Sequence, residues 1–233
     1  MLATRNNLGG DTGNVAGSTH EPSKLAGADW ELERERLLEA ARDPTATATL
    51  AFAGVISRAA LRPAPYAVPI AGVPRAAFAR LLARRFPALD PAIAKALTLA
   101  VPKPALPDSG SDEFVDLAAL LLEGRSVADE STRWLAWAIA TAAMAPDHLW
   151  QDMGLPCRGV LNQLLAEHFA ALHRKNIGDM KWKKFFYRQL CQREEVAICR
   201  SPSCATCSDY AHCFGPEEDP QPGWTRIRVE RAA

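Results

Sequence analysis

The sequence has no excess of charge of either sign. Its 233 residues include 27 Lys and Arg side chains and 27 Asp and Glu side chains, so the formal net charge at pH 7 is zero. A strongly basic chain would favour nucleic acid or an anionic membrane surface as its partner, and a strongly acidic chain would favour basic partners. The overall charge supports neither class, and we expect neither nucleic acid nor a membrane among the partners.

Long hydrophobic runs are also missing. The longest, residues 134–145, has twelve residues, whereas a helix needs about 20 apolar residues to span a bilayer. Residues 1–27 are rich in Gly, Asn, Ser and Thr and lack the apolar segment of a secretory signal. We therefore expect a cytoplasmic protein whose residues 1–27 form a disordered leader.

The alternation of apolar and polar residues that is typical of β-strands does not occur. Apolar residues recur instead at helical spacing. After Pro74, for example, Phe78, Leu81, Leu82 and Phe86 share one side of a helix. Signals of the same kind predict helices over residues 45–61, 91–100, 134–145, 157–175 and 179–194. Asp129 or Ser131 would start the helix that contains residues 134–145.

We therefore predict an all-α fold, a multi-helix, bundle-like domain with a cysteine-rich loop near its C-terminus. The helical domain is assigned to residues 28–178. Residues 179–218 would form a basic aromatic helix followed by a cysteine-rich segment whose chemistry is taken up below, and residues 219–233 a polar tail.

Two segments of the predicted helical domain resemble each other. A Gly-x-Pro sequence at residues 72–74 precedes a Leu-Leu pair and Phe86, and another at residues 154–156 precedes a Leu-Leu pair and Phe169. Each follows an Ala-rich apolar helix. Either a duplicated helix pair or the shared composition of Ala- and Leu-rich helices explains the likeness.

The most specific feature is a cluster of cysteines. Of the six in the chain, five fall between residues 191 and 213, and four read Cys199-x4-Cys204-x2-Cys207-x5-Cys213. Thiols this dense in a reducing compartment are typical of a metal or iron–sulfur site rather than of disulfides. Structural zinc usually uses two Cys-x2-Cys pairs, and here there is one, so the spacing favours an iron–sulfur cluster over zinc.

The helix predicted before this loop carries two different faces. Its aromatic residues and Leu190 form an apolar stripe, while Lys181, Lys184 and Arg188 form a basic stripe that also contains Cys191. Between residues 174 and 200 there are eight basic and three acidic side chains. These cations would attract an anion such as an oxyanion, or an acidic protein surface, although a solvated helix face would look the same.

Signs of a catalytic site are missing. The sequence contains no dinucleotide-binding fingerprint, and its five histidines, at positions 20, 148, 168, 173 and 212, suggest no catalytic set. We expect a protein that carries a metal cluster rather than an enzyme. Two alternatives remain open: a four-cysteine zinc module that binds nucleic acid or protein, and a redox protein that uses a cluster for electron transfer.

The C-terminal half resembles a known family. The resemblance is carried by the helix sequence of residues 180–191, by the four spaced cysteines, and by the Cys-Phe-Gly-Pro-Glu ending at residues 213–217. His148-Leu149-Trp150-Gln151-Asp152, Gly154-Leu155-Pro156 and Asn176 add to it. Together these motifs resemble the NifQ family of nitrogen-fixation proteins over about residues 146–218.

This resemblance implies a protein that binds an iron–sulfur cluster, of 4Fe-4S or molybdenum–iron–sulfur type, and supplies molybdenum for the iron–molybdenum cofactor of nitrogenase. It implies Cys199, Cys204, Cys207 and Cys213 as the cluster ligands. The implied recipients are the cofactor-assembly scaffold NifEN and the nitrogenase iron protein NifH.

A protein that donates a metal must leave part of the metal's coordination labile. We therefore consider Cys191 and His212 as additional or transient ligands; an unligated thiol and a surface histidine are the simpler interpretations. Cys157 lies outside the motif, and we expect it to be a buried free cysteine with no role at the site.

Overall fold

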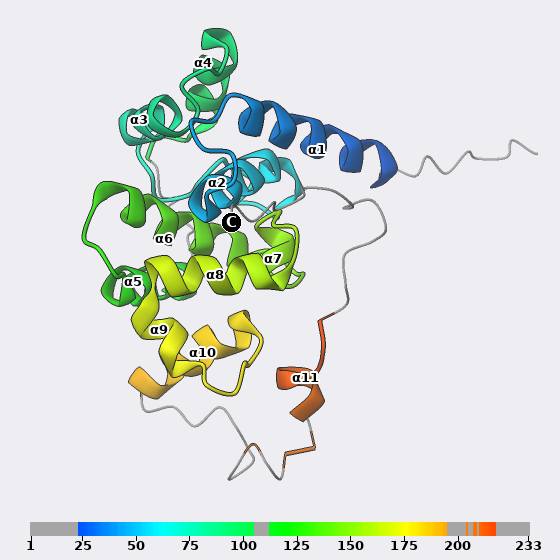
Figure 1. The fold of residues 1–233 in the computed structure, drawn as a ribbon, viewed down its shortest axis with the longest axis vertical. Helices are drawn as coiled ribbons and strands as arrows, with labels where there is room; N and C mark the ends of the chain where they lie inside the picture. The colour runs from blue at the N-terminus through cyan, green and yellow to red at the C-terminus, as the bar shows by residue number, and fades with distance from the viewer. Residues whose placement is uncertain (1–22, 105–111, 195–203, 205–206, 209, 218–233) are drawn as a thin grey trace, which may run out of the picture.

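Helices account for all regular structure in the described part of the chain, which confirms the all-α prediction (Figure 1). The computed structural model describes residues 23–104, 112–194, 204, 207–208 and 210–217. The helices are α1 (Ser23–Glu39), α2 (Thr47–Ser57), α3 (Arg75–Arg85), α4 (Pro91–Ala100), α5 (Asp112–Gly124), α6 (Glu130–Ala143), α7 (Leu149–Asp152), α8 (Arg158–His168), α9 (Ala170–Lys175), α10 (Trp182–Arg193) and α11 (Tyr210–Phe214), with a 3₁₀ turn η1 (Ala59–Leu61) after α2. None of these helices is both long and apolar enough to cross a membrane.

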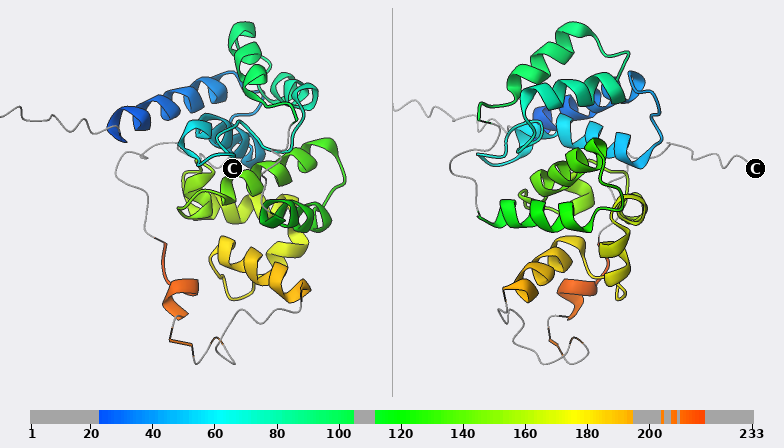
Figure 2. Two further views of the ribbon diagram at one scale, coloured as in Figure 1. Left: turned by 180° about the vertical axis from the view of Figure 1, so that it is seen from behind. Right: turned by 90° about the vertical axis from the view of Figure 1, so that its left-hand side faces the viewer.

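Helix α2 is the centre of the core. All of its residues are buried, and it packs against α1, α6 and α8. Figure 2 shows α1, α3 and α4 on one side of α2, with α5, α6 and α8 on the other and α9, α10 and α11 beyond them. A helix that is apolar on every side must be enclosed by other helices. The position of α2 therefore follows from its composition.

Several predicted helix boundaries are confirmed, and their causes are visible. Helix α4 covers the predicted residues 91–100, with the Asp90 carboxylate accepting from the amides of Ala92 and Ile93. Helix α6 is capped by Asp129, whose carboxylate accepts from Thr132 N–H at 2.6 Å. Such N-caps satisfy amides that have no partner within the helix.

Other predicted boundaries were wrong. The helix expected over residues 157–175 is two helices, α8 and α9, separated at the buried Phe169. Ser126 replaces the lost helical bonds, because its N–H donates to His168 O at 2.7 Å and its hydroxyl accepts from Ala170 N–H at 3.0 Å. Helix α1 begins at Ser23, inside the stretch 1–27 that was assigned to the leader. The predicted tail over residues 219–233 lies outside the described residues.

The two similar segments also have similar structures. Gly72 and Gly154 both have positive φ, 79° and 62°, a conformation that favours glycine. The helices that follow, α3 and α8, each have eleven residues and each end at a buried phenylalanine, Phe86 or Phe169. The likeness therefore extends from sequence to backbone geometry, which favours duplication over shared composition.

Candidate metal centre

Helix α10 separates an apolar face from a basic face. Trp182, Phe185 and Phe186 are buried in the core, whereas Lys184 and Arg188 are exposed. The predicted apolar stripe is therefore confirmed, and so is the basic face for Lys184 and Arg188, whereas Lys181 precedes the helix as its half-buried N-cap residue. The helix packs against α5, and its buried aromatic side chains belong to the core. Figure 1 shows α10 near the end of the molecule opposite α4.

The turn between α9 and α10 is fixed by one amide side chain. Asn176 Oδ1 accepts from Met180 N–H at 2.9 Å, and its Nδ2 donates to Met180 O at 2.9 Å. Asp179 in the same turn has φ 52°, a left-handed conformation that ends or delays a helix. Helix α10 consequently begins at Trp182 and not at residue 179 as predicted.

Arg158, at the start of α8, joins this turn to the far end of the described chain. Its guanidinium donates to Asp179 Oδ1 at 2.8 Å, to Met180 O at 3.1 Å and to Glu217 Oε1 at 3.2 Å. The Glu217 side chain is only 6% exposed. The half-buried Arg158 guanidinium therefore holds two segments of the candidate site against the helical body.

Replacing Arg158 by methionine should loosen both segments. Loss of hydrogen bonds to a charged group should lower the free energy of unfolding by about 2 kcal/mol, measured by urea titration. Amide exchange at Lys181 should also become faster. Arg133→Met, at an exposed position on α6, is the control and should change neither quantity. Unchanged exchange in the Arg158 variant would contradict the anchoring role.

Helix α11 is attached to the start of α10. Lys181 N–H donates to Cys213 O at 2.9 Å, so the main chain of a predicted ligand is bound to the first turn of the basic helix. A Cβ at Gly178 would lie 3.2 Å from the Phe214 ring, which shows how closely this ring lies over the turn. The Tyr210 ring stacks on Phe214 with centroids 4.6 Å apart.

Three of the four predicted ligands lie in the described part of the chain. Cys204, Cys207 and Cys213 are free thiols of intermediate exposure. Cys207 N–H donates to Cys204 O at 3.3 Å, and Arg188 Nη1 lies 3.8 Å from Cys204 Sγ. The structure therefore brings Cys204 to the basic face of α10. The fourth predicted ligand, Cys199, lies outside the described residues.

These thiols supply the type of donor atom that an iron–sulfur cluster or a soft metal ion requires. Cysteine sulfur is the donor that iron–sulfur clusters and zinc share, and a guanidinium beside one of them suits an anionic ligand set. Within the described residues, however, no three His, Cys, Asp or Glu side chains come close enough to hold a metal ion. The four-cysteine ligand set therefore stays a prediction.

The secondary candidates lie in different surroundings. Cys191 is half-buried near the end of α10, and His212 lies on α11 beside Cys213. The expectation for Cys157 was wrong, because this cysteine is exposed rather than buried. It precedes α8, where it is the N-cap residue.

A groove of about 690 Å³ lies beside the cysteine segment. Its walls come from the start of α7, the first turn of α10, and α11 with the residues after it. The charged and imidazole side chains that line it are Asp147, His148, Lys181, Lys183, Lys184, His212 and Glu217. Sequence reasoning did not assign His148 or Glu217 to a site, although both belong to the motifs of the family resemblance.

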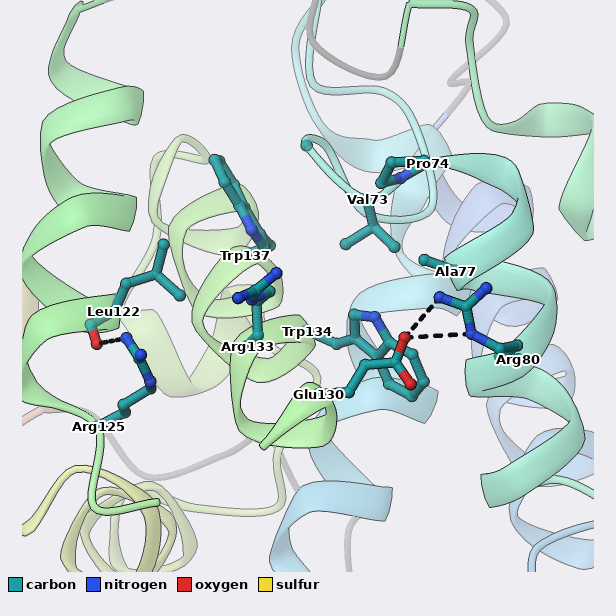
Figure 3. A pocket seen from close by; sticks show the side chains of 11 residues that line it. Val73, Pro74, Ala77, Arg80, Leu122, Arg125, Glu130, Arg133, Trp134 and Trp137 are labelled. Atoms are coloured by element: carbon teal, nitrogen blue, oxygen red, sulfur yellow. Dashed lines mark hydrogen bonds and ion pairs between the residues drawn. The ribbon is translucent and has the colours of Figure 1, made fainter. Parts of the chain in front are cut away.

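A second groove, of about 480 Å³, lies between α3, α5 and α6 (Figure 3). Arg80 reaches across it and donates to Glu130 Oε1 at 2.5 Å, and Trp134 and Trp137 form part of its wall. None of the described residues that line this groove is a cysteine or a histidine. The described lining therefore offers none of the predicted metal ligands.

Fold and site together define the class: an all-helical protein whose C-terminal cysteines are attached to a basic helix. Within that class, the model of one family, described as NifQ, matches residues 51–215. The chain therefore belongs to the NifQ family.

Several curated relatives support this assignment. The chain is 45% identical over 106 residues to Protein NifQ of Azotobacter vinelandii, covering 46% of this chain and 54% of that protein. It is 40% identical over 111 residues to Protein NifQ of Rhodobacter capsulatus, covering 48% of this chain and 61% of that protein. It is 49% identical over 82 residues to Protein NifQ of Klebsiella pneumoniae, covering 34% of this chain and 48% of that protein. The chain thus spans about half the length of the curated relatives it matches. No solved structure matches it.

Proposed function

We propose that this protein takes part in nitrogen fixation by binding molybdenum at its cysteine-rich segment and donating it for iron–molybdenum cofactor biosynthesis. The observation that carries the proposal is the attachment of the cysteines to the basic helix. Cys213 is bound through the Lys181 amide, and Cys204 lies beside the Arg188 guanidinium. Membership of the NifQ family supports the same role.

The ligand set in this proposal is Cys199, Cys204, Cys207 and Cys213. These residues would hold an iron–sulfur cluster of 4Fe-4S or molybdenum–iron–sulfur type, because soft thiolates suit iron and sulfur-bridged molybdenum. When bound, the cluster would supply sulfide ligands to the molybdenum cargo. Arg188 would stabilise the anionic ligand set with a charge-assisted hydrogen bond.

Release of the cargo requires an accessible and incompletely filled site. The three described thiols are only half-buried, so a recipient protein could approach them. Cys191 and His212 are the residues that we propose as transient ligands during release. In this role the protein is a metallocluster carrier in the cytoplasm and not an enzyme with its own turnover reaction.

The proposed recipients are the cofactor-assembly scaffold NifEN and the nitrogenase iron protein NifH. Lys184 and Arg188 lie exposed on one face of α10, and Lys181 lies at its start. A positively charged face beside a metal site would favour docking of an acidic surface. The same face would therefore serve both cargo and partner.

Anaerobic purification followed by metal analysis tests the proposal. The protein should contain iron, and molybdenum after exposure to it, and should give the electron paramagnetic resonance signals of a cluster. Cys204→Ser, Cys207→Ser and Cys213→Ser should each lose most of the iron, because each removes a ligand. Cys157→Ser, at an exposed cysteine outside the segment, is the matched control and should keep it.

The alternative is a four-cysteine zinc module, which the same thiols could form. It would be colourless and contain zinc without iron. Cys191→Ser in the same series tests the transient ligand: reduced donation of molybdenum with unchanged iron content would support it. Iron retained by all three ligand variants would contradict the proposed function.

A further inference from the structure

We propose that the groove between α7, α10 and α11 binds a tetrahedral oxyanion, and that this anion is molybdate on its way to the cysteine segment. The second half of the proposal rests on the proposed function, while the first half stands on the lining of the groove alone. Molybdenum is available to cells in water as an oxyanion, so a protein that collects it would need an anion site before its sulfur ligands.

Positive charge without an ion-pair partner among the described residues lines this groove. Lys181 and Lys184 face it, and in the described part of the chain neither lies within ion-pair distance of a carboxylate. Lys183 differs, because its ammonium group is bonded to the Asp152 carboxylate at 2.5 Å. Two lysines are therefore available to a ligand, and the third supports the structure.

The groove's carboxylates do not cancel this charge. Glu217 lies 3.2 Å from Arg158, a guanidinium that it shares with Asp179, and 3.7 Å from His148 Nδ1. Asp147 is the other carboxylate among the described residues of the lining. Three lysines therefore stand against two carboxylates in the described lining, and the imidazoles of His148 and His212 add donors without negative charge.

The first turn of α10 adds to the positive charge of the groove. Lys181 is the N-cap residue, Lys183 and Lys184 follow in the first turn, and no acidic residue or side-chain cap is present there. The start of a helix carries partial positive charge and free amides, so lysines at this place are unfavourable and acidic residues are the usual choice. A bound anion would reverse this cost, since it would accept from those amides and from the lysines. Departures of this kind from local preference are expected at functional sites.

The groove is adjacent to the candidate metal centre. His212, which lines it, precedes Cys213, and the Lys181 amide donates to Cys213 O at 2.9 Å. An anion held here would lie next to a predicted ligand. The groove of Figure 3 is also positively charged, with Arg80, Arg125 and Arg133 against Glu130, but none of the predicted ligands that the structure describes lines it.

Equilibrium dialysis with radioactive molybdate tests the site in the whole protein. The wild-type chain should bind one molybdate saturably. The double variant Lys181→Gln/Lys184→Gln should bind at least about tenfold more weakly, since two charged donors are lost. Lys95→Gln, an exposed lysine on α4, is the matched control and should bind as the wild type does. Circular dichroism checks that each variant folds.

Equal binding by the double variant and the wild type would overturn the oxyanion site. Phosphate or sulfate that binds as tightly as molybdate would overturn its assignment to molybdate. The failure of the proposed function is distinguishable from both outcomes. If the cysteine variants retained iron while molybdate still bound in the groove, the cluster proposal alone would fail. If iron were lost as expected but the groove bound no anion, this inference alone would fail.

Discussion

Replacing Gly54 by alanine is expected to destabilise the protein by at least about 3 kcal/mol, near the upper end of what overpacking of a core costs. Gly54 lies in α2, which is buried along its whole length. A Cβ at this position would lie 2.1 Å from the carbonyl oxygen of Met153 and 3.0 Å from main-chain atoms of Gly154. Main-chain atoms cannot swing aside as the end of a long side chain can. The helix and the α7–α8 loop would therefore have to separate.

A second glycine provides the matched control. Gly159 lies in the first turn of α8, and among the described residues a Cβ there would meet Cys157 Sγ alone, at an ordinary contact distance of 3.5 Å. Gly159→Ala should therefore be neutral or raise the free energy of unfolding by up to about 1 kcal/mol, because alanine is the better helix former. Urea titration of both variants measures the difference. Similar unfolding free energies for the two variants would contradict the close approach at Gly54.

Local signals in the sequence were sufficient to predict most of the helices. Pro91 after Asp90 predicts the start of α4, and Asp129 predicts that of α6, because a cap acts within three or four residues of itself. The apolar spacing of Trp182, Phe185 and Phe186 predicts which face of α10 is buried.

The errors occur where distant residues determine the backbone. Nothing near Phe169 in the sequence suggests a break, since the bonds that replace the helical ones come from Ser126. The late start of α10 has a nearer cause, because Asn176 bonds to the main chain of Met180 four residues on and Asp179 has a positive φ. Local propensity does not contain such contacts.

The same division applies to the candidate site. Residue type and spacing alone singled out the cysteines and the basic stripe. The groove could not be predicted from sequence, because it exists only where α7, α10 and α11 meet. Ion pairing determines which lysines are available to a ligand. Lys183 is bound to Asp152, which is thirty-one positions away in the sequence.

Replacing one member of the buried Lys183–Asp152 pair is expected to cause the second large loss of stability. The side chains of Lys183 and Asp152 are 17% and 2% exposed, and Lys183 Nζ also donates to Ala145 O. Replacing Lys183 by methionine keeps the length of the side chain but leaves the Asp152 carboxylate buried without its partner. Breaking a buried pair from one side costs about 3–5 kcal/mol. Lys184→Met, at the exposed neighbouring position, should cost less than about 1 kcal/mol.

The pH dependence of this stability loss shows whether the buried Asp152 charge causes it. Burial raises the pKa of Asp152 above its ordinary value of 3.8, even though Lys183 acts in the opposite direction. An acid with a raised pKa in the folded state favours folding at pH values below its unfolded pKa, and this contribution is lost as the pH rises through the folded pKa. Without Lys183 the folded pKa of Asp152 should rise further. The stability gap between Lys183→Met and the wild type should therefore be largest near pH 7 and narrow toward pH 4.

Urea titration of both proteins between pH 4 and pH 8 measures this gap. Adding Asp152→Asn to Lys183→Met should recover part of the loss at pH 7, because the uncompensated charge is then gone. A gap that is the same at every pH, and no recovery in the double variant, would mean that lost packing of the lysine chain explains the effect. Because the pair joins α7 to the first turn of α10, it also fixes two walls of the groove relative to each other. The Lys183 variant should consequently bind molybdate more weakly than Lys95→Gln, although Lys183 is not itself a proposed anion ligand.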